Sequence, residues 1–173
     1  MTDEHDQIPI EEARVSEAAE ILALQKLAYQ SEARIYDDFE IPPLTQTLAQ
    51  MEDDFERQTI LKASLGGRIV GSVRAYAREG TCHIGRVIVH PECQNRGLGA
   101  RLLRAIEERF PAVDRYELFT GQRSERNLYF YKKYGYATFR TEVGPTPGSC
   151  LTYLEKRGAR DSTSPSAAAR SPL

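Results

Sequence analysis

The 173-residue sequence contains no tryptophan, two methionines and three cysteines. The cysteines are odd in number and lack the spacing of metal ligands, which argues against a disulfide framework and against a metal site. Their scarcity favours a reducing, cytoplasmic compartment. No run of residues approaches the roughly 20 apolar side chains of a membrane-spanning helix, and the polar, acidic start differs from a targeting peptide. We therefore expect a protein that binds no metal and does not insert into membranes.

A strong charge of either sign is also missing. Lys and Arg total 23 and Asp and Glu total 25, so the formal net charge is −2. Such a balance provides no general attraction to nucleic acid or to an anionic membrane. With 40% hydrophobic residues, the chain is long enough to bury the core of one globular domain. We expect that domain at residues 7–156, between an acidic, flexible N-terminus (1–6) and a disordered tail rich in Ser, Ala, Pro and Arg (157–173).

The first third of the chain is predicted to be mainly helical. Residues 7–11 alternate apolar and polar side chains, which indicates a short strand, and Pro9 places that strand at a sheet edge. Helical periodicity then covers residues 16–31 and 44–55. The acidic, aromatic stretch between these helices ends at Pro42–Pro43, which favours an irregular or short helical segment.

From Thr59 onward the apolar residues follow a strand period. Gly66–Gly67 and Glu79–Gly80 are typical of tight turns, which predicts a meander of three antiparallel strands. The expected strands are 59–65, 68–77, 81–89, 115–121, 136–143 and 150–155, and the expected later helices are 98–110 and 124–134. This order predicts an α+β fold with a mixed, mostly antiparallel central sheet and helices on both faces.

A short glycine loop connects the third meander strand to an amphipathic helix. In the stretch QNRGLG, Gly97 and Gly99 remove side chains where a ligand would approach the backbone. The first turn of the helix offers unpaired N–H donors and the positive end of the helix dipole, which favours a phosphate or pyrophosphate. A dinucleotide fingerprint would need a third glycine at Leu102, and a Walker loop would need Gly-Lys-Ser/Thr, so both patterns are excluded.

Two motifs resemble a known family. Gln94-x-x-Gly97-x-Gly99 after Val87–Val89 resembles the acetyl-CoA loop of the GNAT superfamily of N-acetyltransferases. The stretch SERNLYFYKKYGY at 124–136 resembles the second signature of the same superfamily. The resemblance covers about residues 7–156 and implies acetyl-CoA as acyl donor, with no metal.

The resemblance also implies which residues contact the donor. The backbone of Val87 and Val89, with Ile88 between them, would pair with the pantetheine arm. Many members have Asn where this chain has Ser124, and Asn127 follows one helical turn later, so either side chain is a candidate for contacting CoA. The pyrophosphate would lie on the N–H groups of Gln94, Asn95, Arg96, Gly97, Leu98, Gly99 and Ala100.

Three residues are candidates for the chemistry. Tyr131 matches the position of the family's tyrosine that protonates the departing thiolate and contacts CoA, although it also fits a core aromatic. His83 is separated from Val87 and Val89 by an even number of positions, so in a regular strand the three side chains would share one face. His83 is therefore a candidate base, with a structural histidine as the alternative. Glu32, in the acidic segment after the first helix, is a candidate for substrate contact or base. A base acting through water is equally compatible with the sequence.

These observations predict direct transfer of an acetyl group from acetyl-CoA to the primary amine of a small molecule. A protein N-terminal or lysine acetyltransferase is an alternative that would need an acceptor groove open at both ends. A non-enzymatic CoA-binding sensor or interaction module is a further alternative. We expect neither nucleic acid nor membrane as partner, and a homodimer built on the late strands is compatible with the sequence.

Overall fold

The computed structural model describes residues 8–160. The predicted flexible N-terminus (1–6) and positions 161–173 of the predicted disordered tail therefore lie outside the described residues. At the C-terminal end, the last strand continues to Arg157, and the N–H of the buried Gly158 donates to the carbonyl of Asp114 at 2.7 Å. The packed part of the chain thus extends beyond residue 156.

The N-terminal part is helical, as predicted, but its boundaries differ. The elements are β1 (Ile10–Glu12), the 3-10 helix η2 (Val15–Glu17), α1 (Ala18–Ala28), α2 (Gln30–Tyr36), α3 (Pro42–Thr45) and α4 (Leu48–Arg57). The predicted continuous helix over 16–31 is wrong, because α1 ends at Ala28 and α2 starts at Gln30 after Tyr29. The predicted helix over 44–55 starts late at Leu48, because Thr47 and Gln50 form a reciprocal capping box there.

A seven-stranded sheet with the order β1-β2-β3-β4-β5-β7-β6 forms the centre of the molecule. Its other elements are β2 (Thr59–Leu65), β3 (Arg68–Arg78), β4 (Thr81–Val89), the 3-10 helix η3 (Pro91–Cys93), α5 (Leu98–Glu108), β5 (Arg115–Gly121), α6 (Glu125–Lys133), β6 (Ala137–Val143) and β7 (Cys150–Arg157). All neighbouring strands are antiparallel except β4 and β5. The predicted α+β class and the mixed, mostly antiparallel sheet are therefore confirmed.

Two hydrophobic clusters lie on opposite faces of the sheet. On one face, α5 buries Leu98, Leu102 and Ile106 against the strands. A Cβ on Gly71 of β3 would lie 2.8 Å from Leu102 Cδ1, so this glycine lets α5 pack close to the sheet. The opposite face is covered by α1 and α4, whose cluster includes Ile21, Leu24, Met51 and Ile88.

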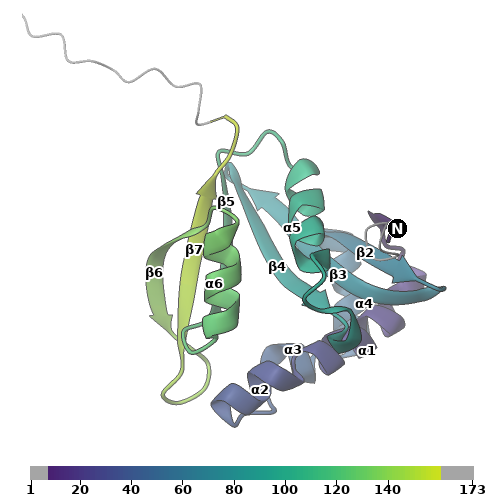
Figure 1. Cartoon of the computed structure of the whole chain (residues 1–173), viewed down its shortest axis with the longest axis horizontal. Helices are drawn as coiled ribbons and strands as arrows, with labels where there is room; N and C mark the ends of the chain where they lie inside the picture. Colours follow the sequence, from purple (N-terminus) through teal and green to yellow (C-terminus); the bar gives the residue numbers. More distant parts are fainter. Residues whose placement is uncertain (1–7, 161–173) are drawn as a thin grey trace, which may run out of the picture.

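The two parallel strands separate along their length. β4 and β5 pair over three positions, from Thr81 opposite Arg115 to His83 opposite Glu117. Beyond His83, β4 keeps its pairing with β3 but has no strand partner on its β5 side. Figure 1 shows the two strands close together at the top of the view and diverging toward the bottom, where α2 and α3 lie. The sheet therefore opens at the carboxyl ends of β4 and β5.

At the far edge, β6 is exposed along its whole length. An uncovered edge strand is a surface on which a second copy could pair. The homodimer compatible with the sequence stays a prediction.

Candidate active site

A cavity of about 810 Å³ occupies the opening between the separated strands. Its walls come from Ile84–Val89 of β4, from Phe119–Gly121 of β5, from the glycine loop, and from α2 and α6. Of the predicted catalytic residues, Tyr131 and Glu32 line this cavity, whereas His83 does not. Of the predicted donor-binding residues, all except Arg96 line it.

The glycine loop forms the cradle expected for an anion. Gly97 is the N-cap of α5 with φ +79°, and no side chain caps the helix. Within residues 8–160, the N–H groups of Gly97, Leu98, Gly99 and Ala100 have no acceptor. A Cβ on Gly97 would meet no atom within 4 Å, so the space beside the loop is open. Unpaired donors at the positive end of a helix are suited to a pyrophosphate.

The loop is braced by a side chain that sequence reasoning missed. Arg126 of α6 donates from Nη1 to Gln94 Oε1 at 3.0 Å and from Nη2 to Asn95 Oδ1 at 3.1 Å. Gln94 in turn donates from Nε2 to the carbonyl of Val89 at 3.2 Å. Arg126 is exposed and lines the cavity, so it both holds the loop and adds positive charge beside the N–H cradle. The sequence does not indicate that a side chain in the first turn of α6 contacts the glycine loop.

The backbone of β4 presents Val89 to the cavity. The N–H of His90 donates to the carbonyl of Val70 on β3 at 2.7 Å. Because successive N–H groups of a strand point to opposite sides, the N–H of Val89 points away from β3, into the opening. The bond from Gln94 to the Val89 carbonyl lies on the same side. This is the orientation that pairing with a pantetheine arm, or hydrogen bonding to an acyl oxygen, would need.

His83 does not share a face of β4 with Val87 and Val89, because β4 contains a bulge between them. The register with β3 shifts between Ser72 and Arg74, and Arg86 opposite this shift has φ +52°. An extra residue reverses which face the following side chains occupy. Accordingly, Ile84 packs in the cluster of α5, whereas Ile88 packs in that of α1 and α4.

His83 lies outside the cavity, and its contacts are those of a structural histidine. Its ring stacks on Tyr76 with centroids 4.9 Å apart, and its Nδ1 lies 3.9 Å from Glu117 Oε1. The geometry therefore gives no support to His83 as the base.

Glu32, Ser124 and Asn127, which are distant in sequence, meet at one point. Ser124 Oγ donates to Glu32 Oε2, and Asn127 Nδ2 donates to Glu32 Oε1 at 3.1 Å. Asn127 Nδ2 also lies 3.2 Å from Thr120 Oγ1. Both candidates for contacting CoA thus bond to Glu32 of α2 and hold its carboxylate at the cavity wall.

Tyr131 lines the cavity from α6 and its side chain is almost fully enclosed. The residue is 8% exposed, and no hydrogen bond within residues 8–160 engages its hydroxyl. Burial, with smaller contributions from Tyr29 and Glu32, raises the pKa of Tyr131 well above 10. The phenol is therefore protonated at neutral pH and can donate a hydrogen bond.

The end of α2 and the residues that follow it are hydrogen-bonded to the β5–α6 loop and to the β6–β7 loop. Tyr36 Oη accepts from the N–H of Arg123 at 2.8 Å. Thr146, in the loop between β6 and β7, donates from Oγ1 to Asp38 Oδ2. This hydrogen bond, together with one from the N–H of Glu40, lowers the pKa of Asp38. Tyr36 and Thr146 both line the cavity, so these hydrogen bonds fix part of its wall.

Comparison with known proteins agrees with this site. The family model of the acetyltransferase (GNAT) family matches residues 19–136, which is more than half of the chain. The fold and the cradle thus define an acyl-CoA-dependent transferase of this type. The chain belongs to the acetyltransferase (GNAT) family. A search of curated proteins finds no match.

Solved structures with the same fold have low sequence identity to this chain. An acetyltransferase of the GNAT family from Streptococcus pneumoniae is 20% identical, with a TM-score of 0.71 over 88% of this chain and 100% of that one. PaiA N-acetyltransferase from Thermoplasma acidophilum, in complex with coenzyme A, is 14% identical, with a TM-score of 0.70 over 87% and 99%. The ribosomal-protein-S18-alanine N-acetyltransferase from Escherichia coli is 13% identical, with a TM-score of 0.71 over 86% and 92%.

Acetyltransferases of this family use acetyl-CoA as donor. The unpaired N–H groups of the glycine loop and the open edge of β4 fit its pyrophosphate and its pantetheine arm. Residues 8–160 contain no cluster of three His, Cys, Asp or Glu side chains placed to hold a metal ion. In the same range, no helix combines the length and the apolar character needed to cross a membrane.

Proposed function

We propose that this protein transfers the acetyl group of acetyl-CoA to the primary amine of a small molecule. The observation that carries the proposal is that Tyr131, Val89 and the glycine loop line one cavity, and that the N–H of Val89 points away from β3. Direct transfer needs a neutral amine, a donor for the developing oxyanion and a proton donor for the departing thiolate. No covalent enzyme intermediate is required.

The donor half of the site is built from β4 and the start of α5. The N–H groups from Gln94 to Ala100 hold the pyrophosphate, and the backbone of Val87 and Val89 orients the pantetheine arm. When bound, acetyl-CoA supplies a thioester-activated acetyl group, and the products are the N-acetylated amine and the CoA thiol. The N–H of Val89 donates to the acyl oxygen as negative charge develops on it.

Tyr131 acts on the leaving sulfur. Because burial raises the pKa of its phenol, Tyr131 remains protonated throughout the neutral range and offers its O–H to the developing thiolate. The same raised pKa disfavours a lasting tyrosinate. Tyr131 must therefore recover a proton in the same turnover, and the amine releases one when it becomes an amide.

Glu32 contacts the acceptor amine. Ser124 and Asn127 each donate to one oxygen of its carboxylate, and each oxygen retains a further lone pair for an ammonium group. Glu32 thus orients the amine and accepts its proton directly or through water. We assign His83 no part in this step.

The hydrogen bonds of Tyr36 and Asp38 favour a small acceptor over a peptide. Tyr36 joins the end of α2 to the β5–α6 loop, and Asp38 joins the following segment to the β6–β7 loop. These contacts restrict the groove that a continuous peptide would need. The direct experiment follows thiol release from acetyl-CoA with a panel of small amines and with peptides that have free N-termini or lysines. We expect turnover with small amines. Binding of CoA without thiol release for any amine would overturn the proposal.

A further inference from the structure

Arg86 lies at the bulge of β4 with an unsatisfied guanidinium. Its Nε is buried and has no hydrogen-bond partner within residues 8–160. No carboxylate in that range forms an ion pair with Arg86. Its Cζ lies 5.5 Å from the centroid of the Tyr29 ring, a stacking contact that orients the group without satisfying its donors. A partly buried cation in this state is costly unless an anion binds it.

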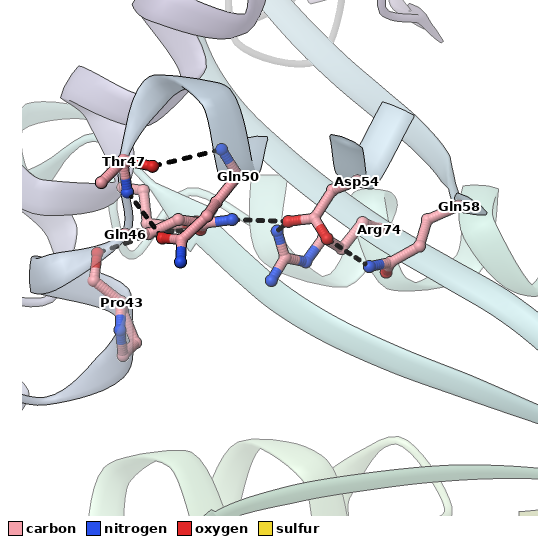
Figure 2. A network of polar contacts seen from close by, with 8 residues as sticks. Pro43, Gln46, Thr47, Gln50, Asp54, Gln58 and Arg74 are labelled. Atoms are coloured by element: carbon pink, nitrogen blue, oxygen red, sulfur yellow. Dashed lines mark hydrogen bonds and ion pairs between the residues drawn. The ribbon is translucent and has the colours of Figure 1, made fainter. Parts of the chain in front are cut away.

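The neighbouring arginine, by contrast, already has its counterion. Arg74 Nη1 donates to Asp54 Oδ2 at 2.5 Å, and the two side chains are 13% and 20% exposed. Figure 2 shows the Asp54 carboxylate held by Arg74 and by the amides of Gln46 and Gln58. Asp54 is therefore fully engaged and does not neutralise Arg86.

Residues of this network line another cavity, of about 390 Å³, which lies between α3, α4 and strands β3 and β4. Arg86 and Pro42 line both this cavity and the larger cavity of the candidate active site, which is called the donor cavity below. Arg57, Arg74 and Arg86 provide three guanidinium groups around it, against the two carboxylates of Asp53 and Asp54. The residues that line this smaller cavity, Arg86 among them, thus carry an excess of one positive charge.

The bulge explains why Arg86 reaches this position. Arg86 has φ +52°, a conformation that side-chain-bearing residues rarely adopt, at the point where β4 changes face. Bulges of this kind redirect side chains beside active sites. Here the redirected side chain belongs to the strand whose next residues, Val87–Val89, face the acyl donor.

We propose that Arg86 binds a carboxylate of the acceptor, so that the substrate is an amine that also carries a carboxylate, such as an α-amino acid. This inference rests on the proposed function and specifies its substrate class. The planar guanidinium fork matches a carboxylate in a bidentate geometry. A single negative charge balances this excess, whereas a phosphate dianion would exceed it and face the carboxylates of Asp53 and Asp54.

The test compares α-amino acids with their amides, which keep the shape and lose the charge. Rates are referred to the concentration of neutral amine, because an amide lowers the basicity of the adjacent amino group. We expect kcat/KM to be at least about tenfold higher for the acids. Arg86→Gln should lower kcat/KM for the acids by about 10- to 100-fold and change it by less than about threefold for the amides. Arg78→Gln, at the exposed end of β3, removes the same charge and should keep the preference for acids.

Each outcome separates this inference from the proposed function. Equal rates for acids and amides in the wild-type protein, or an equal loss for both in Arg86→Gln, would overturn the role of Arg86 and leave acetyl transfer intact. Binding of CoA without acetylation of either series would overturn acetyl transfer. In that case calorimetry with N-acetyl amino acids and their amides on the CoA-loaded protein still decides the role of Arg86. Equal affinities for the two series, or no change on Arg86→Gln, would refute it.

Discussion

Asn127 of α6 donates a hydrogen bond from Nδ2 to Oε1 of Glu32 on α2 at 3.1 Å, across 95 positions of sequence. Asn127 belongs to the stretch that resembles a CoA-binding signature, yet its side chain bonds to Glu32, the residue that we propose contacts the acceptor amine. Ser124, at the start of the same stretch, donates to the other oxygen of Glu32. The residues at the start of this stretch therefore connect α6 to α2 through both oxygens of one carboxylate.

The first prediction tests that connection. Asn127→Ala removes the bonds to Glu32 and Thr120, so we expect the free energy of unfolding to fall by about 1–2 kcal/mol. We expect the KM for the amine to rise more than the dissociation constant of CoA. Asn127→Asp should destabilise further, because a second carboxylate would face Glu32. Chemical denaturation and calorimetry measure both effects. A large loss of CoA affinity with unchanged stability would show instead that Asn127 contacts CoA.

The second prediction concerns the proton donor. Tyr131→Phe keeps the buried ring and removes the hydroxyl, so kcat should fall by about 100-fold or more while CoA affinity stays within about threefold. Tyr129→Phe is the matched control, because Tyr129 lies on the same helix and is 72% exposed. Steady-state kinetics and calorimetry of CoA binding provide the comparison. Unchanged turnover in Tyr131→Phe would indicate another acid, or a protein that binds CoA without catalysis.

The third prediction tests the brace of the glycine loop. Arg126→Ala removes two hydrogen bonds to loop side chains and one positive charge near the pyrophosphate cradle. CoA affinity should fall by about three- to tenfold and become less dependent on salt. Arg104→Ala, on the exposed side of α5, is the control for the change in charge. An equal effect of both substitutions on CoA affinity would assign the loss to general electrostatics.

The glycine loop and the helix that follows it could be predicted from the sequence because local patterns determine them. The loop from Gln94 to Gly99 needs glycine where the backbone must be open, and the periodicity from Leu98 to Ile106 fixes the helix that follows. A cradle of backbone N–H groups depends little on distant side chains, so its residues can be recognised in a short stretch. The meander of three antiparallel strands could also be predicted, since glycine turns define it.

The contacts between elements that are distant in sequence could not be predicted. Nothing in the stretch HIGRVIV marks Arg86 as a bulge residue with a positive φ. Because of this bulge, His83 and Val87 do not share the face of β4 that a regular strand would give them. The helical periodicity likewise gives no signal for the break at Tyr29 between α1 and α2. Arg126 reaches Gln94 and Asn95 because the fold brings α6 beside the loop, 31 residues away in sequence from Asn95.

The fourth prediction concerns stability at alkaline pH. Burial, with the nearby charge of Glu107, raises the pKa of the Cys82 thiol from 9.0 to about 12. Below pH 9 the thiol is protonated in both the folded and the unfolded state, so its contribution to stability is fully present. Between pH 9 and 12 the unfolded state releases this proton while the folded state retains it, so stability falls as pH rises. Burial raises the pKa values of Tyr116 and Tyr136 as well, and these groups act in the same direction at higher pH.

Urea denaturation at pH 8 and pH 10.5 measures this effect. We expect the free energy of unfolding to fall between these two pH values, with Cys82 alone contributing about 2 kcal/mol. Cys82→Ala should be less stable than the wild type at pH 8, because it leaves a small cavity in the hydrophobic cluster to which the buried Cys82 belongs. It should lose about 2 kcal/mol less than the wild type between the two pH values. An identical pH dependence in both proteins would mean that the Cys82 thiol ionises in the folded state as readily as in the unfolded chain.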